Sequence, residues 1–283
     1  MMKYHNKLTI ILISYKSEKK IKYFVKRIPK NIKTIIIENS NNFKLKKNIE
    51  DKYKNIKVFI KKNEGVSASI NFAVKKIKTE FFIQISPDII FDYKNIAKFF
   101  IIAKKLKNKF SALGPRFLNV NYKSHVQINK NLCIGSIESI HGSCMFINKK
   151  RFKEIGGFDD KFFLYFEETD YCKKALMIGL KSYQINTIKV KSKGRTVILD
   201  NKQEKSKLDN ILTWHFIWSK FYYTKKYNGK FIALVVFFPI LIRIFFRIIL
   251  YKVINDKKKF KKYKFRLEGL VSSILGMKSN LRP

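Results

Sequence analysis

Apolar segments of strand length alternate with segments of helical periodicity over the first 90 residues or so. The strand-like segments are apolar almost throughout and comprise residues 8–14, 34–38, 58–60 and 81–85. Runs of this kind are typical of strands that are buried on both faces of a parallel sheet. Between them, apolar side chains recur at helical spacing, as at Ile21, Phe24 and Val25. The alternation predicts an α/β fold, Rossmann-like, with a mostly parallel sheet flanked by helices.

Polar side chains follow three of these strands at the point where each strand ends. They are Ser14 and Tyr15 after the first strand, Glu38 after the second and Asp88 after the fourth. The carboxyl ends of parallel strands meet at one edge of the sheet, where ligands bind. There Tyr15 can stack on a base, Glu38 can accept a pyrimidine N–H, and Asp88 can hold a divalent cation on a diphosphate. Ser and Asp are also common turn formers, so the prediction of a site depends on their joint placement.

An acidic segment distinguishes the middle of the chain. The protein has 20 acidic residues in 283, and a cluster of them comprises Asp159, Asp160, Glu167, Glu168 and Asp170. One interpretation is structural, because acids in the first turn of a helix are stabilised by the helix dipole and by unpaired N–H groups. The other is chemical. An aromatic run at residues 162–166 would desolvate the carboxylates, and a partly desolvated carboxylate can act as a general base near neutral pH.

The same segment carries a family resemblance. Residues 156–181 read GGFDDKFFLYFEETDYCKKALMIGLK. This string resembles the acceptor-side motif of family-2 glycosyltransferases of the GT-A fold, especially their rhamnosyltransferase-like branch, whose pattern is approximately GGFDE-x-FF-x-YFED-x-DLC-x-R. The resemblance covers residues 8–196. It implies a GT-A fold and an inverting transfer of a sugar from a nucleotide-diphosphate donor, with one base opposite the leaving group. The rhamnosyltransferase-like branch suggests rhamnose as that sugar.

The resemblance also implies roles for residues on the acceptor side. Glu168 falls at the second position of the family's E-D pair and is expected to be the base, although Glu reaches one methylene further than the usual Asp. Glu167 and Asp170 are expected to orient the acceptor or the base. Further acceptor-side residues are Gly142, Asp159 and Phe166.

On the donor side, the resemblance assigns a set of residues to the nucleotide sugar. The set comprises Ser14, Tyr15, Glu38, Asn63, Gly65, Asn71 and Asp88. Asp88 stands in the string Ser-Pro-Asp-Ile, which matches the family variant N-P-D-V. It is therefore expected to bind a divalent cation, Mg²⁺ or Mn²⁺.

The sequence departs from the family pattern at Ser192, where many members have a His that serves as a further metal ligand. The cation would lose a good nitrogen ligand there. Lys191, Lys193 and Arg195 are candidates to offset the diphosphate charge instead. The departure leaves metal dependence open. It also keeps a second hypothesis, a catalytically silent, glycosyltransferase-like scaffold bound to a membrane.

Residues 201–283 are predicted to form a helical, membrane-associating appendage after a GT-A domain at residues 1–200. Residues 209–227 are rich in aromatic side chains, residues 231–242 are uncharged, and Arg243 and Arg247 interrupt the apolar run that follows. A spanning helix needs about 20 apolar residues, and the two arginines argue against a simple span. Aromatic and cationic flanks favour an interfacial membrane helix. A packed core or oligomer helix and a tilted span remain alternatives.

The chain has a formal net charge of +41, with 61 Lys and Arg residues. The dominance of Lys fits codon bias in an A/T-rich genome, and the charge also fits attraction to anionic lipid or phosphorylated substrates. The Lys residues are spread along the chain, which disfavours specific nucleic-acid binding. Three cysteines without metal-type spacing predict reduced thiols. We therefore expect a cytoplasmic protein on the inner face of the cell membrane. The resemblance, together with the appendage, implies a lipid-linked or polysaccharide acceptor in cell-surface glycan synthesis.

Overall fold

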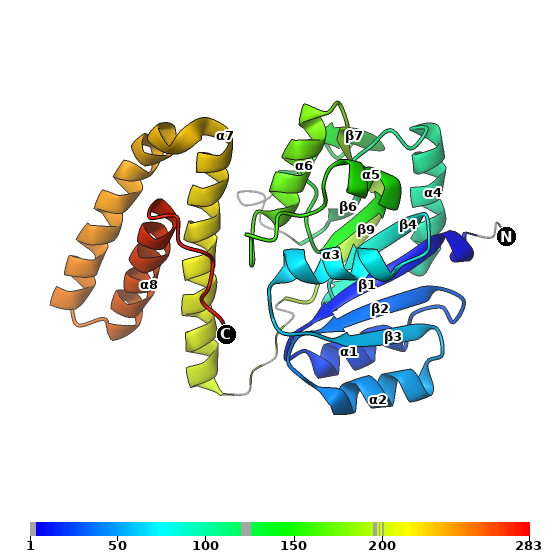
Figure 1. Cartoon of the computed structure of the whole chain (residues 1–283), viewed down its shortest axis with the longest axis horizontal. Coiled ribbons are helices and arrows are strands. Elements are labelled where there is room, and N and C mark those ends of the chain that lie inside the picture. The colour runs from blue at the N-terminus through cyan, green and yellow to red at the C-terminus, as the bar shows by residue number, and fades with distance from the viewer. Residues whose placement is uncertain (1–3, 120–125, 195–196, 198, 200) are drawn as a thin grey trace. The chain divides into compact units, whose positions relative to one another are not determined.

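A computed structural model describes residues 4–119, 126–194, 197, 199 and 201–283 (Figure 1). The chain forms two compact units. The first comprises residues 1–159 and 167–198, and the second comprises residues 160–166 and 199–283. The sequence predicts a division near residue 200. It does not reveal that the segment 160–166 groups with the C-terminal helices.

The first unit is built on a mixed sheet of nine strands within the described residues, in the order β3-β2-β1-β4-β8-β6-β9-β5, with β7 beside β9. Its parallel half consists of β1 (Leu8–Ser14), β2 (Lys33–Glu38), β3 (Ile56–Ile60) and β4 (Phe81–Ile85). The other half consists of β5 (Ile89–Ile90), β6 (Leu113–Phe117), β7 (Ile134–Ile137), β8 (Cys144–Asn148) and β9 (Ser182–Ser192). Strand β8 is antiparallel to both β4 and β6. The predicted α/β architecture is therefore confirmed.

Helices cover both faces of this sheet (Figure 1). One face carries α1 (Glu18–Val25), α2 (Phe43–Lys52) and α4 (Ile96–Lys105), and the other carries α3 (Val66–Lys76), α5 (Lys149–Glu154) and α6 (Glu167–Met177). Short 3-10 turns precede β1 (His5–Lys7) and α4 (Tyr93–Asn95). In β1, Leu8, Ile10 and Leu12 pack on the first face and Ile11 packs on the second. Because successive side chains alternate between the faces, a strand covered on both sides must be apolar throughout.

The strand order fixes where a ligand can bind. From β1 the chain proceeds outward through β2 and β3, and it then returns to place β4 on the other side of β1. In open α/β sheets, the crevice beyond the carboxyl ends of the strands at such a reversal is the usual binding site. Here the reversal lies between Ser14, at the end of β1, and the turn that contains Asp88 after β4.

One predicted strand differs in extent from the structure, because β3 begins at Ile56 rather than at residue 58. Residues 111–115 also suggest a short strand from the sequence, and the observed β6 covers Leu113–Phe117. The polar, turn-rich sequence of residues 119–138 predicts a loop or hairpin; residues 120–125 lie outside the described part of the chain, and residues 134–137 form β7.

The second unit is helical. Its helices are α7 (Lys202–Val253) and α8 (Lys257–Ile274), and α7 is interrupted at Gly229, whose φ of 83° and ψ of 163° are not helical. We call residues 202–228 the first half of α7 and residues 230–253 the second half. Figure 1 shows α7 folding back on itself, with α8 lying between the two halves. Gly229 permits this reversal because residues with a side chain rarely adopt such a positive φ.

A small apolar core holds these helices together. It joins Ile217 and Phe221 of the first half of α7 to Phe237 and Ile244 of the second half and to Leu270 of α8. Gly269 lies at the crossing, because a Cβ atom there would stand 2.5 Å from the carbonyl oxygen of Trp214. Glycine is therefore required for the close approach of α8 to the first half of α7.

His215, on the first half of α7, is fully buried where the C-terminal tail meets the segment 160–166. Its Nε2 bonds the carbonyl of Leu281 at 2.8 Å, its Nδ1 lies 2.9 Å from the hydroxyl of Ser279, and its ring stacks on Phe163. A carbonyl can only accept, so Nε2 carries the proton. Burial lowers the pKa of His215 to about 4, with a smaller contribution from the charge of Arg282.

This pKa predicts an acid-sensitive helical unit. Because the folded state keeps His215 neutral while the unfolded state protonates below pH 6.5, stability falls as the pH is lowered towards 4. We expect a loss of about 2 kcal/mol from this group between about pH 7 and pH 5. Urea unfolding followed by tryptophan fluorescence reports on this unit, because Trp214 and Trp218 both lie on α7.

The control is His215→Gln, which keeps a donor for the carbonyl of Leu281 but cannot titrate. The wild-type protein minus this variant isolates the histidine contribution from carboxylates elsewhere in the chain. A difference that does not change between the two pH values would contradict the assignment.

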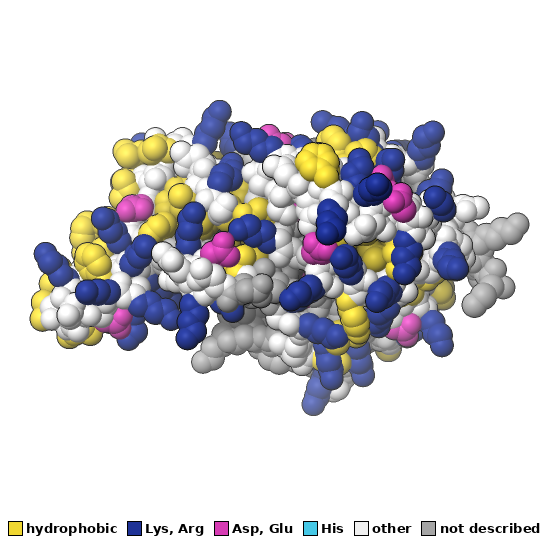
Figure 2. Space-filling view, turned by 90° about the horizontal axis from the view of Figure 1, so that it is seen from below, with side chains coloured by type: hydrophobic (Ala, Val, Ile, Leu, Met, Phe, Trp, Pro, Cys, Tyr) yellow, Lys and Arg dark blue, Asp and Glu magenta, His cyan; other side chains and the backbone are white. Residues whose placement is uncertain are grey.

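Lys and Arg side chains cover the visible surface of both units, with few acidic side chains among them (Figure 2). This distribution agrees with the spread of Lys along the sequence, and the face shown carries no single basic module.

Candidate functional site

Ser14 and Glu38 lie side by side at the carboxyl edge of the sheet, as paired residues of β1 and β2. The hydroxyl of Ser14 is 3.0 Å from that of Ser17, and both residues are buried. The carboxylate of Glu38 accepts the backbone N–H groups of Ser40 and Asn42 at 2.8 to 3.1 Å, and also the Ser40 hydroxyl. Glu38 therefore stabilises the loop at residues 40–42. A base N–H that bound here would be an additional donor to a carboxylate that already accepts these hydrogen bonds.

Tyr15 is half-buried just beyond β1, and the Lys16 ammonium lies 6.0 Å from its ring centroid. Lys16 has a φ of 45°, so the chain turns sharply directly after Tyr15. The structure thus keeps an aromatic ring at the end of β1, where the sequence predicts a base-stacking residue.

The predicted donor-side residues on and before α3 have structural partners. Asn63 accepts the N–H of Gly65 at 3.3 Å, and Gly65, with a φ of 100°, begins α3. Asn71 donates to the carbonyl of Phe158 at 2.8 Å and accepts its N–H at 3.1 Å. Asn71 therefore fastens α3 to the turn at residues 156–159. Gly157 must be glycine there, because its φ is 67° and a Cβ would lie 2.9 Å from Asn71 Oδ1.

Asp88 is buried at the turn after β4 and accepts a hydrogen bond of 2.7 Å from the hydroxyl of Ser192. The pairing of β5 with β9 brings these residues together, and the carbonyl of Asp88 also accepts the N–H of Lys193. Ser192 occupies the position at which the resembling family often has His. The two positions expected to share a metal therefore lie in direct contact.

The cations near Ser192 are placed differently from one another. Lys193 holds its ammonium 4.3 Å from the ring centroid of Tyr23 on α1, and its hydrogen bond and charge lower the pKa of Tyr23. Lys191 is exposed on β9. Arg195, the third cation predicted to offset the diphosphate charge, lies outside the described residues.

The acidic segment forms the first turn of α6, with Glu167, Glu168 and Asp170 together at its start. Burial raises the pKa of Glu167 well above its ordinary value, and the neighbouring charge of Glu168 raises it further. Burial also raises the pKa of Glu168, although its own backbone N–H and that of Gly142 partly oppose the shift. Oε2 of each residue is buried without a hydrogen-bond partner among the described atoms. Burial of these oxygens without a partner disfavours the ionised form of both carboxyl groups.

Gly142 connects these carboxyl groups to the Asp88 turn. A Cβ on Gly142 would lie 3.4 Å from the carboxyl carbon of Glu168, so the glycine backbone lies directly against that group. Strand β8 starts beside the carboxyl end of β4, where Ser86 donates its N–H to the carbonyl of Ser143 at 2.8 Å. The donor-side turn and the start of α6 therefore meet at residues 141–143.

Gln84 was not predicted from the sequence. It is a buried amide on β4 that donates to the carbonyl of Gly142 at 2.5 Å, and its own carbonyl oxygen has no partner among the described atoms. The available signal was the polar Gln within the otherwise apolar string Phe-Phe-Ile-Gln-Ile, since a buried polar side chain in a central strand needs a partner.

The remaining acceptor-side residues lie in different surroundings. Asp170 is fully buried and 3.6 Å from the ammonium of Lys174, which also donates to the carbonyl of Gly157. Through Lys174, Asp170 thus stabilises the turn at residues 156–159. Asp159 is half-buried at the end of that turn, within the first unit.

The aromatic run at residues 162–166 has ring partners within the helical unit that the sequence does not predict. That it walls the carboxylates stays a prediction. Phe162 packs on Tyr222, and both Tyr165 and Phe166 pack on Phe216. The sequence therefore identifies the burial of the carboxyl groups but not the partners of the aromatic side chains.

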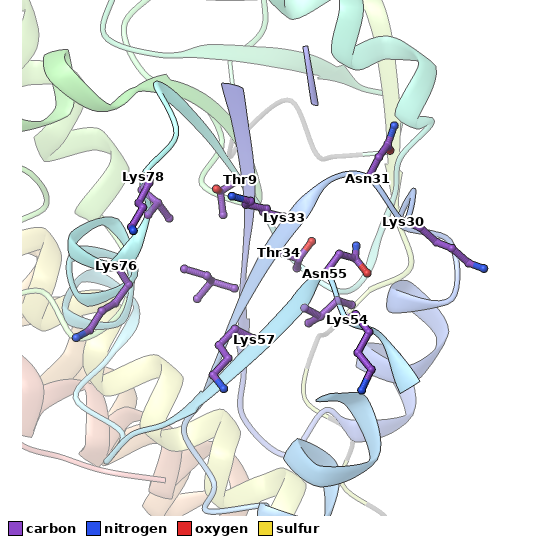
Figure 3. A pocket seen from close by; sticks show the side chains of 13 residues that line it. Thr9, Lys30, Asn31, Lys33, Thr34, Lys54, Asn55, Lys57, Lys76 and Lys78 are labelled. Carbon is purple, nitrogen blue, oxygen red and sulfur yellow. The ribbon is translucent and has the colours of Figure 1, made fainter. Parts of the chain in front are cut away.

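A basic cavity lies at the amino ends of the strands, away from this edge (Figure 3). Its volume is about 570 Å³, and its lining includes Thr9, Thr34 and Asn55 together with Lys30, Lys33, Lys54, Lys57, Lys76 and Lys78. All six lysines are exposed. The cavity belongs to the general basic surface and holds none of the predicted site residues.

No protein-family model matches the chain. The low-salt glycan biosynthesis hexosyltransferase Agl10 of Haloferax volcanii is 24% identical over 197 residues, which cover 59% of this chain and 61% of that protein. The chain thus spans less than two thirds of the length of this curated relative.

Solved structures resemble the chain more extensively. The mannosyltransferase PcManGT of Pyrobaculum calidifontis, in complex with GDP-Man and Mn²⁺, gives a TM-score of 0.59 at 11% identity and covers 96% of this chain and 88% of its own. S. aureus TarS 1–349 with UDP-GlcNAc gives 0.57 at 13% identity, covering 96% and 92%. GalNAc-T7 with UDP, GalNAc and Mn²⁺ gives 0.53 at 14% identity, covering 68% and 44%.

The fold is that of the GT-A glycosyltransferases. The edge described above is therefore the carboxyl edge of a GT-A sheet. Its topological reversal lies at Ser14 and at the turn containing Asp88.

The residues at this edge fit a cation that has few ligands from the protein. No group of three or more His, Cys, Asp or Glu side chains in the described parts of the chain could hold a metal. Asp88 and the hydroxyl of Ser192 supply one carboxylate and one neutral oxygen. Mg²⁺ and similar hard cations accept such a set when substrate phosphates and water complete the shell. The residues fit an ion held mainly by a diphosphate, not one enclosed by protein.

The buried pair predicts a stability effect at Glu167. A raised pKa means that the folded state keeps the proton more firmly than the unfolded state does. The stabilising contribution is therefore complete below 4.5 and is lost as the pH rises through the folded pKa. We expect Glu167→Gln to raise the melting temperature by a few degrees at about pH 8 and to change it little at about pH 4.

The matched control is Glu154→Gln, an exposed carboxylate in an ion pair with Arg151. That variant should not stabilise the protein at either pH, because exposed pairs contribute little. An equal shift at both pH values for Glu167→Gln would show that burial of the charge is not the cause.

Proposed function

We propose that the protein is an inverting glycosyltransferase that moves a sugar from a nucleotide-diphosphate donor to a hydroxyl of an acceptor. The observation that supports this most strongly is the position of Gly142 between the Asp88 turn and the carboxyl group of Glu168. A donor whose diphosphate lies at Asp88 would have its sugar near a buried carboxyl group. The hexosyltransferase relative and the sugar-nucleotide complexes of the structural neighbours support the same class of reaction.

Glu168 is the proposed general base. The acceptor oxygen attacks the anomeric carbon, its proton passes to the carboxylate of Glu168, and the bond from that carbon to the diphosphate oxygen breaks. A raised pKa suits this role, because a base works best when its pKa lies near the working pH. The N–H of Gly142 bonds the carboxylate and so keeps it available in its ionised form.

Asp88 and Ser192 are proposed to hold the donor end of the site. A divalent cation, Mg²⁺ or Mn²⁺, would supply electrostatic stabilisation of the departing nucleoside diphosphate when bound. Asp88 would contribute the carboxylate ligand, and Ser192 would orient it through the 2.7 Å hydrogen bond. Ser14, Tyr15 and Glu38 would hold the nucleoside, and residues 63–71 would line the sugar diphosphate.

The finer assignments are also proposals. Rhamnose as the donor sugar follows from the motif at residues 156–181. A lipid-linked or polysaccharide acceptor in cell-surface glycan synthesis is supported by the glycan-biosynthesis role in the relative's name. The apolar second half of α7 supports a site of action at a membrane. The net charge of +41 favours an anionic surface, and a peripheral position on the cytoplasmic face is proposed with it.

Donor binding can be tested by thermal shift with a panel of nucleoside diphosphate sugars, with and without Mn²⁺ or Mg²⁺. A ligand that binds the native state must raise its melting temperature. Asp88→Ala should weaken donor binding by roughly tenfold or more and remove its dependence on the cation. Asp92→Ala is the control, because Asp92 is an exposed acid that caps the turn before α4. An unchanged dissociation constant for Asp88→Ala would refute its placement.

The chemical step is tested by Glu168→Gln. The amide has nearly the same shape but cannot take a proton, so transfer should fall by at least roughly 100-fold while donor affinity stays within a few fold. Radiolabelled sugar transfer and donor titration measure the two quantities separately. Turnover near the wild-type rate would remove Glu168 from the mechanism.

A catalytically silent scaffold is the second candidate. Ser192 favours it, because a hydroxyl is a weaker metal ligand than the imidazole found in many members of the resembling family. The buried carboxyl pair at the start of α6 opposes it, since a silent protein has no need of two desolvated acids. Hydrolysis of, or transfer from, any sugar nucleotide by the purified protein would exclude the scaffold.

A further inference from the structure

The second half of α7 has two different faces. Ala233, Phe237 and Ile244 face the other helices and are buried. The opposite side is an exposed apolar arc, which comprises Phe231, Leu234, Val235, Phe238, Ile242, Phe245, Phe246, Ile249, Leu250 and Val253. Phe231 and Val253, near its two ends, are 78% and 77% exposed. A soluble surface rarely leaves so continuous an apolar strip uncovered.

The packing of α8 decides how this arc can meet a bilayer. At about 1.5 Å per residue, the second half of α7 is long enough to cross a hydrocarbon core of about 30 Å. However, Leu270 of α8 belongs to the same core as Phe237 and Ile244, and Tyr263 packs on Tyr251. If the helix spanned the membrane, α8 would enter the hydrocarbon with Lys261, Lys262, Lys264 and Arg266. Charged side chains at that depth are strongly unfavourable, so a span would require α8 to dissociate from α7.

Cations border the apolar arc at both ends. Lys225, Lys226 and Lys230 precede it, and the segment 243–268 contains ten cations and two acids. Cations near both ends of the strip suit a transverse helix as well as one lying in the plane, because in both cases the ends lie among headgroups. Arg243 and Arg247, however, are exposed within the length of the strip, and this favours the in-plane arrangement, which keeps them near the headgroups. Hydrophobic and basic side chains alternate over this unit in Figure 2.

A cluster of rings and cations forms the tip of the α7–α8 hairpin. Arg247 donates to the hydroxyl of Tyr251 at 3.1 Å and lies 5.5 Å from the ring centroid of Tyr263. Lys259, from the first turn of α8, lies 5.2 Å from the Tyr251 ring. Two tyrosines held between two cations resemble the amphipathic belt that membrane proteins place at headgroup level.

We propose that the second half of α7 lies in the plane of an anionic phospholipid bilayer. The apolar arc enters the acyl region, and the tip cluster of Arg247, Tyr251, Lys259 and Tyr263 binds the lipid phosphates. This inference rests on the membrane association in the proposed function and adds its geometry and its lipid class. A second copy of the chain is a poor occupant of the arc, because it would bring two basic segments together without screening.

The orientation is tested with the full chain and vesicles of phosphatidylcholine, alone or with about one quarter phosphatidylglycerol. Single cysteines at Phe231, Phe238, Phe245 and Val253 carry a fluorophore in a Cys133→Ser background, since Cys144 and Cys172 are buried. Lipids with quenchers at graded depths then report the depth of each site. We expect equal, shallow depths at all four positions. Deep positions at Phe238 and Phe245 with shallow ends would show a span and overturn the proposal.

Matched variants test the two parts of the surface by vesicle flotation. Phe246→Asp should weaken binding by roughly tenfold, because it places a charge within the arc. Phe43→Asp should not, although Phe43 on α2 is 66% exposed and Phe246 is 69% exposed. Replacement of Arg247 and Lys259, the two cations of the tip cluster, by Gln should abolish the preference for phosphatidylglycerol. The same change at the exposed Lys44 and Lys47 on α2, with an equal loss of charge, should not.

The remaining outcomes are decisive as well. Absence of flotation with phosphatidylglycerol vesicles, or equal binding to neutral vesicles, would overturn the lipid assignment. A concentration-dependent dimer that Phe246→Asp dissociates, without vesicle binding, would show that a second copy covers the arc. None of these assays contains a sugar donor, so failure of the transferase hypothesis would leave flotation unchanged, and failure of the membrane proposal would leave donor binding unchanged.

Discussion

The antiparallel pairing of β8 with β4 determines the rest of the site. It places residues 141–143 beside the carboxyl end of a parallel strand, so a backbone segment from later in the chain enters the crevice where a ligand binds. Gln84, on β4, fixes this segment through a hydrogen bond to the carbonyl of Gly142. The carboxyl group of Glu168 packs against the same backbone, since a Cβ atom on Gly142 would lie 3.4 Å from its carboxyl carbon. One strand pairing thus joins the donor-side turn to the start of α6.

The burial of Glu167 beside Glu168 opposes ionisation of the pair and so costs free energy whenever both are charged. Two adjacent desolvated carboxyl groups oppose each other's ionisation, and the raised pKa of Glu167 has both of these causes. The first turn of α6 lowers the cost, because unpaired N–H groups at a helix start favour negative charge. It does not remove it, since one oxygen of each residue stays without a partner in the described structure. This excess burial distinguishes the pair from an ordinary capping arrangement.

The sequence predicts the local features well and the long-range ones poorly. The strands β1, β2 and β4 are evident because burial on both faces forces a continuous apolar run, and a strand's carboxyl end follows directly. The bond of Asn71 to Phe158 joins residues far apart in the chain, and no local pattern marks it. The aromatic run is apparent in the sequence, but apolar character does not specify a partner. Its rings pack on α7 within the helical unit, and the sequence does not identify these partners.

Two glycines determine how the apolar helix α7 is packed in the helical unit. Without the reversal at Gly229, α7 would be one continuous helix that is long and apolar enough to cross a membrane. The reversal lets α8 lie against both halves, and Gly269 permits the close crossing with the backbone of Trp214. Once α8 is packed there, its lysines and the apolar strip are fixed in one rigid hairpin. In the proposed arrangement, this hairpin keeps the charges at headgroup depth while the apolar strip lies in the plane of the bilayer.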